Sequence, residues 1–192
     1  DLYSYGLASD VYPAIKEAGL KYSQSYGGSY SIMFNPAVFE DTARINPFSN
    51  RKIREAMNWL IDRNYINQEI YAGGSLPKFF AVTTQLVEYT DLIDTARALE
   101  SKYAYNPEKA KEVIDAEMAA MGAELGADGK WQYNGAPITL SFLIRPDGDG
   151  TRKPMGDYVA NQLETIGFTV DRQYKKSSEA APIWRGSQAK LG

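Results

Sequence analysis

The hydrophobic pattern of the chain is clearest across residues 46–77. Apolar residues recur there at spacings of three and four, which places them on one stripe of an α-helix, while charged residues occupy the other positions. The stripe consists of Ile53, Ala56, Met57, Leu60 and Ile61. Either Ser49 or Asn50 can cap the start of this helix. The pattern predicts an amphipathic helix packed on a core, followed by a second short helix over residues 62–71 that Gly73 ends.

Two shorter patterns precede this segment. Residues 10–17 are predicted to form a short helix that Gly19 ends. Apolar and polar residues alternate across residues 29–34, and Gly27-Gly28 can adopt the positive φ angles of a tight turn. We therefore expect residues 20–26 and 29–34 to form a β-hairpin.

A second strong helix is predicted to begin at Asn106. This residue is a favourable N-cap, Pro107 suits the first helical position, and Gly122 can end the helix. A further helix is predicted for residues 91–102.

The rest of the chain predicts strands around one more helix. A short strand over residues 130–133 lies between two turn dipeptides, and residues 138–144 alternate as a strand does. Residues 152–166 carry a helical stripe, and residues 168–174 again form a strand. Two strands joined by a crossover helix make a βαβ unit with parallel strands. Residues 175–192 have no clear period, so no element is predicted for them.

The composition is that of a folded globular protein. The chain has 192 residues, of which 44% are hydrophobic, and it can bury one substantial core. No apolar run approaches the roughly 18 residues that a membrane-spanning helix needs. We expect residues 1–192 to form a single domain.

Charge and residue usage exclude several classes of function. The chain has no Cys and no His, which rules out disulfides, thiol chemistry, Cys/His zinc sites and an imidazole base. Its net charge of -3 is mixed in sign along the sequence. Nucleic acid is therefore not expected as a partner.

No motif assigns catalysis, a metal or a cofactor. Asp147 and Asp149 have the spacing of calcium-loop ligands, but Tyr158 occupies the position that should carry a bidentate Glu. Gly129-Lys130 lacks the other residues of a phosphate loop. No Ser lies in a G-x-S-x-G elbow. A hydrolase that uses a pair of carboxylates remains open, although the sequence distinguishes no pair.

Aromatic residues supply most candidates for ligand contact. The chain has 14 tyrosines against 7 phenylalanines, and a ring with a polar hydroxyl suits half-wet surfaces such as clefts. Position and chemistry select five candidate ligand-binding residues: Tyr30, Phe79, Phe80, Arg145 and Trp184. Each also has a structural interpretation. The pattern favours one of the two phenylalanines in the core with the other partly exposed, and it favours a loop-anchoring salt bridge for Arg145.

Several stretches resemble one family of transport proteins. Residues 46–77 are similar to the second lobe of the oligopeptide- and dipeptide-binding proteins that serve bacterial and archaeal ABC importers. The similar positions are Asn46-Pro47-Phe48, Arg51, Arg54, Glu55-Ala56-Met57-Asn58, Ile61-Asp62-Arg63, Ile66, Tyr71, Gly73 and Pro77. Residues 105–111, 128–144 and 159–170 resemble the same family in the family's own order. Residues 177–184 look like a branch of the family, which leaves the substrate open.

The resemblance implies an α/β fold of mixed character. This would be one lobe of a periplasmic-binding-protein type II fold, with a mixed sheet flanked by helices, a β-hairpin and a C-terminal βαβ unit. Residues 1–192 would then be most of the second lobe of a larger two-lobed protein, truncated at both ends.

The resemblance also implies a function without catalysis. The protein would be the substrate-binding component of an ABC transporter, periplasmic or extracellular, with membrane anchoring of the full-length protein left open. It would capture an oligopeptide or another small solute, such as a sugar, an opine or a nickel chelate, and deliver it to permease subunits. Its partners would be the solute, the permease and the first lobe. A hydrolase and a free-standing interaction domain are the alternatives.

Overall fold

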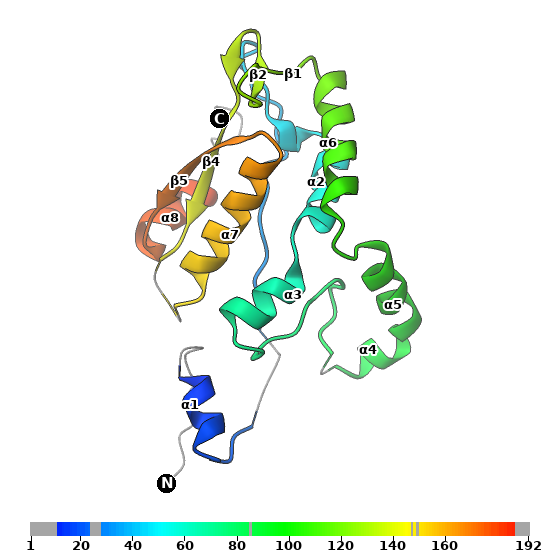
Figure 1. Ribbon diagram of the computed structural model, residues 1–192, viewed down its shortest axis with the longest axis vertical. Helices are drawn as coiled ribbons and strands as arrows, with labels where there is room; N and C mark the ends of the chain where they lie inside the picture. The colour runs from blue at the N-terminus through cyan, green and yellow to red at the C-terminus, as the bar shows by residue number, and fades with distance from the viewer. Residues whose placement is uncertain (1–10, 24–27, 85, 147, 149, 187–192) are drawn as a thin grey trace.

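The computed structural model describes residues 11–23, 28–84, 86–146, 148 and 150–186. The molecule is elongated, with the N-terminal helix at one end and a small antiparallel sheet at the other (Figure 1). Among the described helices, none combines the length and the hydrophobicity that a membrane crossing requires.

Helices dominate the first two thirds of the chain. They are α1 (Tyr12–Glu17), a 3₁₀ turn (Pro47–Ser49), α2 (Arg51–Leu60), α3 (Arg63–Tyr65), a π-helical turn (Ile66–Ile70), α4 (Val87–Asp91), α5 (Ile93–Lys102) and α6 (Pro107–Ala120). The remaining elements are β1 (Glu124–Leu125), β2 (Trp131–Tyr133), β3 (Ala136–Pro137), β4 (Thr139–Ile144), α7 (Arg152–Thr165), β5 (Thr169–Tyr174) and α8 (Ser177–Trp184).

Side-chain caps begin the helices where the sequence predicts them. The Asn50 side chain accepts a hydrogen bond of 2.8 Å from the backbone N–H of Lys52 at the start of α2. The Asn106 side chain accepts one of 2.9 Å from the N–H of Lys109 in α6. Asp62 caps α3 in the same way. Each cap satisfies an N–H that the helix itself cannot pair.

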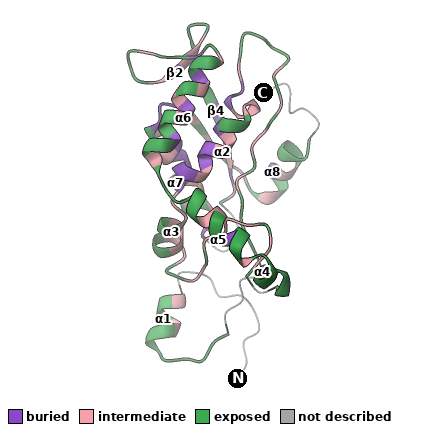
Figure 2. Cartoon of the chain, turned by 90° about the vertical axis from the view of Figure 1, so that its right-hand side faces the viewer, coloured by how far each residue is buried: buried purple, intermediate pink, exposed green. Residues whose placement is uncertain are grey.

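The core lies between α2, α6, α7 and the strands (Figure 2). All five residues of the predicted α2 stripe are at most 6% exposed. Ile114 and Met118 of α6 are fully buried and belong to the same cluster, as do Val159 and Leu163 of α7. One contiguous core therefore supports both halves of the described chain.

The strands form two small sheets. β1, β2 and β3 pair antiparallel, and β4 pairs with β5 in parallel, from Thr139 opposite Thr169 to Ile144 opposite Tyr174. The predicted βαβ unit with α7 as its crossover is confirmed. Trp131 links β2 to the connection between α7 and β5, because its indole N–H donates to the carbonyl of Ile166 and its backbone N–H to that of Gly167, each at 2.9 Å.

The predicted β-hairpin over residues 20–34 is wrong for the residues that the structure describes. Residues 28–34 form no strand, and residues 24–27, with most of the turn, lie outside the described chain. The alternation in this segment is nevertheless real, because Ile32 and Phe34 pack against the core while Met33 is 69% exposed. The Phe34 ring lies 4.6 Å from that of Phe48. The alternation of apolar and polar residues arises because one side of this extended segment is buried against the core, although no strand of the described chain pairs with it.

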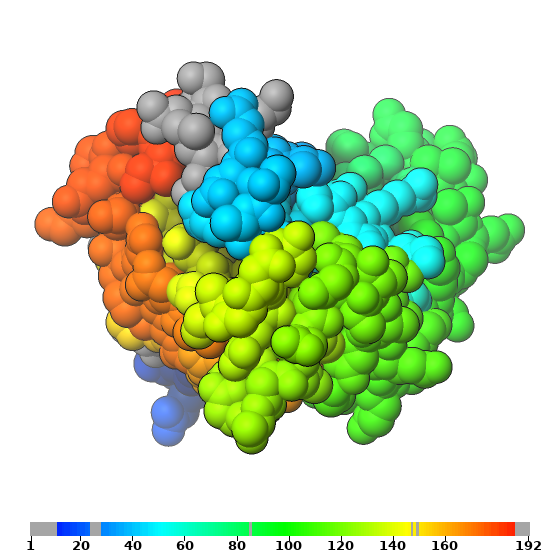
Figure 3. All heavy atoms as spheres, turned by 90° about the horizontal axis from the view of Figure 1, so that it is seen from above, coloured from blue at the N-terminus to red at the C-terminus, as the bar shows by residue number. Residues whose placement is uncertain are grey.

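Asn46 holds the end of this extended segment. Its side-chain amide donates to the carbonyls of Asn35 at 2.7 Å and Ala37 at 2.9 Å. Seen from above, the blue segment around residues 35–45 lies against the yellow-green strands (Figure 3). The backbone groups that a sheet would pair are in this way partly satisfied by a side chain.

Helix α8 is an element that the sequence pattern did not reveal. Ala180 is its one buried residue among those described, so no apolar stripe marks it. Pro182 lies inside it, and proline normally argues against a helix interior. The Glu179 carboxylate accepts from the backbone N–H of Lys176 at 2.9 Å and helps to start the helix.

Candidate ligand-binding site

A cavity of about 460 Å³ opens beside α3 and the loop that follows the π-helical turn. Aromatic rings from distant parts of the chain line it, and we call it the aromatic cavity. Its aromatic members are Tyr30, Tyr71, Phe79, Phe80 and Tyr89, and Arg63, Lys78 and Glu100 are its charged members. The size is within the range of small-ligand sites in proteins.

Three of the five candidate residues meet in this cavity. Tyr30 comes from the extended N-terminal segment, while Phe79 and Phe80 come from the loop after Pro77. Tyr30 is 48% exposed, and its hydroxyl lies 3.4 Å from Nη2 of Arg152 in α7. The expectation that one phenylalanine would lie in the core is wrong, because both are half-buried and neither belongs to the core cluster.

Arg145 and Trp184 lie elsewhere. Arg145 follows β4 and is half-buried, and Trp184 ends α8 with 47% of its surface exposed. The Arg185 guanidinium carbon lies 4.6 Å from the centroid of the Trp184 ring. Among the described residues that line the aromatic cavity, neither of these two candidates appears.

Partly buried polar contacts position the wall of the cavity. Thr151, only 1% exposed, donates its hydroxyl to that of Tyr71 at 3.2 Å. The Asn67 carboxamide oxygen accepts from the backbone N–H of Ser75 at 3.1 Å and from its hydroxyl at 3.0 Å. Gly73, with φ of 75°, makes the turn between Tyr71 and Ser75. The loop therefore leaves the π-helical turn in a defined direction and carries Phe79 and Phe80 to the cavity.

Arg63 is a residue of this site that the candidate set missed. It lies at the start of α3 and donates to the carbonyl and side-chain oxygens of Asn58 at 3.1 and 2.7 Å. Its guanidinium carbon lies 4.4 Å from the centroid of the Phe79 ring, within cation–π range. Burial lowers the pKa of the Arg63 guanidinium from its ordinary value. In the sequence, Arg63 was marked only by its place directly after the cap Asp62 and by its membership of the family-like run Ile61-Asp62-Arg63.

A second cavity of about 210 Å³ lies beneath the segment of residues 32–48. It is lined mainly by apolar side chains that also contact the core, including Phe34, Phe48 and Phe142. None of the five candidate residues lines it. The aromatic cavity is therefore the better candidate for a ligand with polar groups.

The described carboxylates form no cluster suited to metal binding. Within the described ranges, no group of three or more Asp or Glu residues could hold a metal ion. Asp147 and Asp149, the candidates for a calcium loop, lie outside those ranges.

The model of the family "Bacterial extracellular solute-binding proteins, family 5 Middle" matches residues 1–189. No curated protein matched the chain.

Solved structures are similar over most of the chain. An oligopeptide-binding protein, AppA, from Bacillus subtilis in complex with a nonapeptide is 24% identical over 70% of this chain and 25% of its own, with a TM-score of 0.57. A periplasmic oligopeptide-binding protein of an ABC transporter from Thermotoga maritima is 22% identical over 90% of this chain and 32% of its own, with a TM-score of 0.60. A mannohexaose-bound structure of an oligopeptide-binding protein from the same organism is 25% identical over 70% of this chain, with a TM-score of 0.53.

These similarities identify the fold. The chain has the mixed α/β architecture of part of a type II periplasmic binding protein. It spans about a quarter to a third of the length of these relatives.

Proposed function

The chain belongs to family 5 of the bacterial extracellular solute-binding proteins, and from this we propose that it forms part of the substrate-binding component of an ABC transporter. In this role the complete protein captures an oligopeptide or a similar small solute and delivers it to permease subunits in the membrane. The match of the family model to residues 1–189 is the observation that carries the proposal.

The aromatic cavity is our proposed ligand surface within this chain. Tyr30, Phe79 and Phe80 approach it from two segments that are far apart in sequence, as expected of a site built by the fold. Their rings would contact apolar parts of the solute. For Arg145 and Trp184, which lie outside this cavity, we propose contacts with other parts of the solute.

We propose that residues 1–192 act as one domain within the second lobe of a two-lobed protein. The shared core of α2, α6 and α7 supports a single folding unit. Closure of the first lobe over the aromatic cavity would add contacts that exist only in the closed state, and these contacts would favour closure with bound ligand.

Binding without chemistry agrees with the charges around the cavity. A hydrolase that uses two carboxylates needs one acid on each side of the scissile bond. Among the described lining residues, Glu100 is the one acid, and Arg97 forms an ion pair with it at 2.5 Å. The geometry therefore favours capture of a solute over its hydrolysis.

Native mass spectrometry of the complete protein tests the proposed function. We expect a peptide or another small solute to co-purify after mild isolation, and calorimetry should show that the emptied protein binds it again. Cell fractionation should place the protein outside the cytoplasm, in the periplasm or attached to the outer face of the membrane. A complete protein that carries no solute and binds none from libraries of peptides, oligosaccharides and metal chelates would contradict the proposal.

A further inference from the structure

Two cations line the aromatic cavity. Arg63 lies against the Phe79 ring, and Lys78 is the residue directly before Phe79. Both side chains are half-buried. The cavity therefore brings positive charge next to apolar rings in a place where water is partly excluded.

The guanidinium of Arg63 has donors to spare. Of its five N–H groups, two are used in the hydrogen bonds to the two oxygens of Asn58. No carboxylate of the described chain forms an ion pair with Arg63 or with Lys78. Both partners of Arg63 are neutral oxygens, so its charge is hydrogen-bonded but not compensated.

The acid that lines the same cavity is already engaged. Glu100 accepts from Arg97 at 2.5 Å, and the Tyr89 hydroxyl lies 3.4 Å from its other oxygen. Glu100 therefore does not neutralise Arg63 or Lys78. The charge of the cavity wall is positive on balance.

A half-buried cation without a counter-charge favours an anionic partner. Withdrawing a charge from water is costly unless an opposite charge replaces the lost hydration. Guanidinium pairs particularly well with carboxylate, because two parallel N–H groups can meet its two oxygens. The adjacent rings would at the same time disfavour a small inorganic anion, because they cannot replace its hydration shell, and would accept the apolar part of an organic acid.

We propose that the aromatic cavity binds a carboxylate of the transported solute, with Arg63 as its principal partner and Lys78 as a second cation. This inference rests on the proposed function and narrows the class of solute. It selects a peptide or another organic acid with an apolar group beside the carboxylate, and it selects against a neutral oligosaccharide.

Calorimetry on the complete protein tests this proposal with four probes. The probes are the peptide Ala-Ala-Ala-Phe with a free carboxyl terminus, its C-terminal amide, the amide of Ala-Ala-Glu-Phe, and mannohexaose. We expect the free acid to bind about 10- to 100-fold more tightly than its amide, as the loss of a charge-assisted hydrogen bond predicts. Mannohexaose should bind more weakly than the free acid.

Variants assign the preference to Arg63. Arg63→Met should remove the preference for the free acid, so that the acid and its amide bind with equal affinity, whereas Arg63→Lys should keep part of the preference. Arg51→Met removes a cation from the exposed start of α2, outside the cavity, and should change neither affinity. Thermal unfolding of each variant, followed by circular dichroism, separates loss of binding from loss of folding.

The outcomes distinguish this inference from the function on which it rests. If the free acid and the amide bind equally well, or if Arg63→Met keeps the preference while folding normally, the inference is wrong and the binding function stands. If none of the three peptides binds, the inference is wrong, and the binding function is then decided by the library test described above. If the terminal carboxylate and the glutamate side chain raise the affinity equally, and Arg63→Met abolishes both increases, the site accepts any carboxylate. If only the terminal carboxylate raises the affinity, the site binds the end of a peptide.

Discussion

Tyr158 connects α7 to the start of α3. Its hydroxyl accepts the backbone N–H of Asp62 at 3.0 Å, and its ring stacks on that of Tyr65 at 4.6 Å. Burial raises the pKa of Tyr158 to about 12, against a smaller opposing effect of the hydrogen bond from Asp62. Since Asp62 caps the helix that begins with Arg63, Tyr158 helps to fix the position from which Arg63 reaches the cavity.

Tyr158→Phe should lower the free energy of unfolding by about 1 kcal/mol, because the N–H of Asp62 loses its partner in a partly buried place. Urea unfolding at pH 7 measures the change. Tyr105→Phe is the matched control, since Tyr105 is 45% exposed and makes no hydrogen bond to the described residues. Equal stability of Tyr158→Phe and the unchanged protein would show that this hydroxyl does not tie the elements together.

Tyr158 should also make the stability of the folded protein depend on pH in the alkaline range. The native state favours the neutral phenol, so its folded pKa lies above the unfolded value of about 10, and its contribution is present below pH 10. That contribution should be lost as the pH rises toward the folded pKa of about 12. Stability of the unchanged protein should therefore fall more steeply over this range than that of Tyr158→Phe.

Residues with partners nearby in sequence were predictable, and those with distant partners were not. Asn50 and Asn106 cap helices that begin right after them, so a local rule sufficed. The environment of Phe79 depends on Arg63, and Tyr30 reaches the same cavity from another segment. No spacing rule brings such residues together, which is why two of the five candidates fell outside the cavity and Arg63 was missed.

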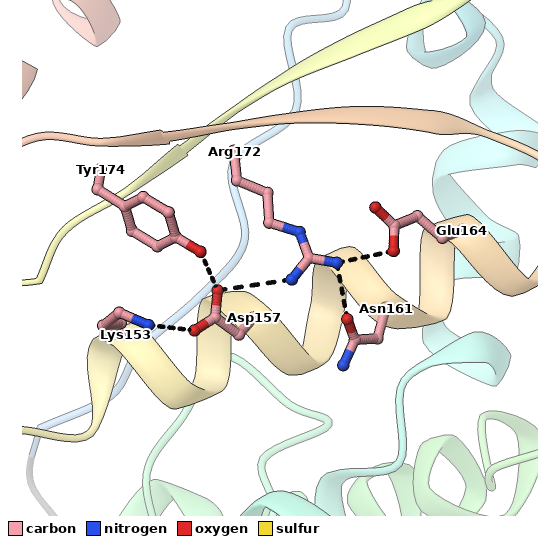
Figure 4. Close-up of polar contacts among 6 residues, drawn as sticks. All are labelled: Lys153, Asp157, Asn161, Glu164, Arg172 and Tyr174. Atoms are coloured by element: carbon pink, nitrogen blue, oxygen red, sulfur yellow. Dashed lines mark hydrogen bonds and ion pairs between the residues drawn. The ribbon is translucent and has the colours of Figure 1, made fainter.

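At the scale of elements, a polar network fastens α7 to β5 (Figure 4). Asp157 of α7 accepts from Lys153 at 2.7 Å and from the hydroxyl of Tyr174, and it lies 3.7 Å from Arg172. Arg172 of β5 also donates to Glu164 at 2.7 Å. Burial tends to raise the pKa of Asp157, but the hydrogen bonds from Lys153 and Tyr174 and the positive charges of Lys153 and Arg172 outweigh it and lower the pKa.

Asp157→Asn should reduce stability at pH 7 by about 0.5 to 1 kcal/mol, a value kept small because solvent screens partly exposed pairs. The folded pKa is depressed, so the carboxylate stabilises the native state at neutral pH and loses this effect as the pH falls through the folded value, below about pH 4. Urea unfolding at pH 7 and pH 3 should therefore differ less for the variant than for the unchanged protein. Glu112→Gln, on the exposed face of α6, controls for loss of one negative charge. An undiminished difference would contradict the role of Asp157.

Helices and strands with strong local sequence patterns were predicted correctly, but the way they pair was predicted only in part. The βαβ unit followed from its strand and helix patterns, because neighbouring parallel strands need a crossover connection and a helix usually provides it. The alternation around Phe34 could not show whether a second strand lies beside it, and in the structure a core face takes that place. Helix α8 has too small a buried surface to leave a periodic pattern.

At the scale of the whole molecule, we propose that this chain is part of one lobe of a larger binding protein. A single lobe presents one wall of a cleft and lacks the contacts that closure adds. The 192-residue chain by itself should fold cooperatively but bind peptides only weakly or not at all. Circular dichroism and calorimetry on the isolated chain test this, and peptide binding at micromolar affinity or tighter would contradict it.

The most direct test of the central claim is the affinity of the complete protein for its co-purified solute before and after Phe79→Ala. Calorimetry should show at least about a tenfold loss, because the change removes an aromatic wall of the cavity and the ring that supports Arg63. Phe39→Ala, which alters the second cavity instead, should bind almost as tightly as the unchanged protein. Unchanged affinity in a correctly folded Phe79→Ala variant would show that the solute binds elsewhere.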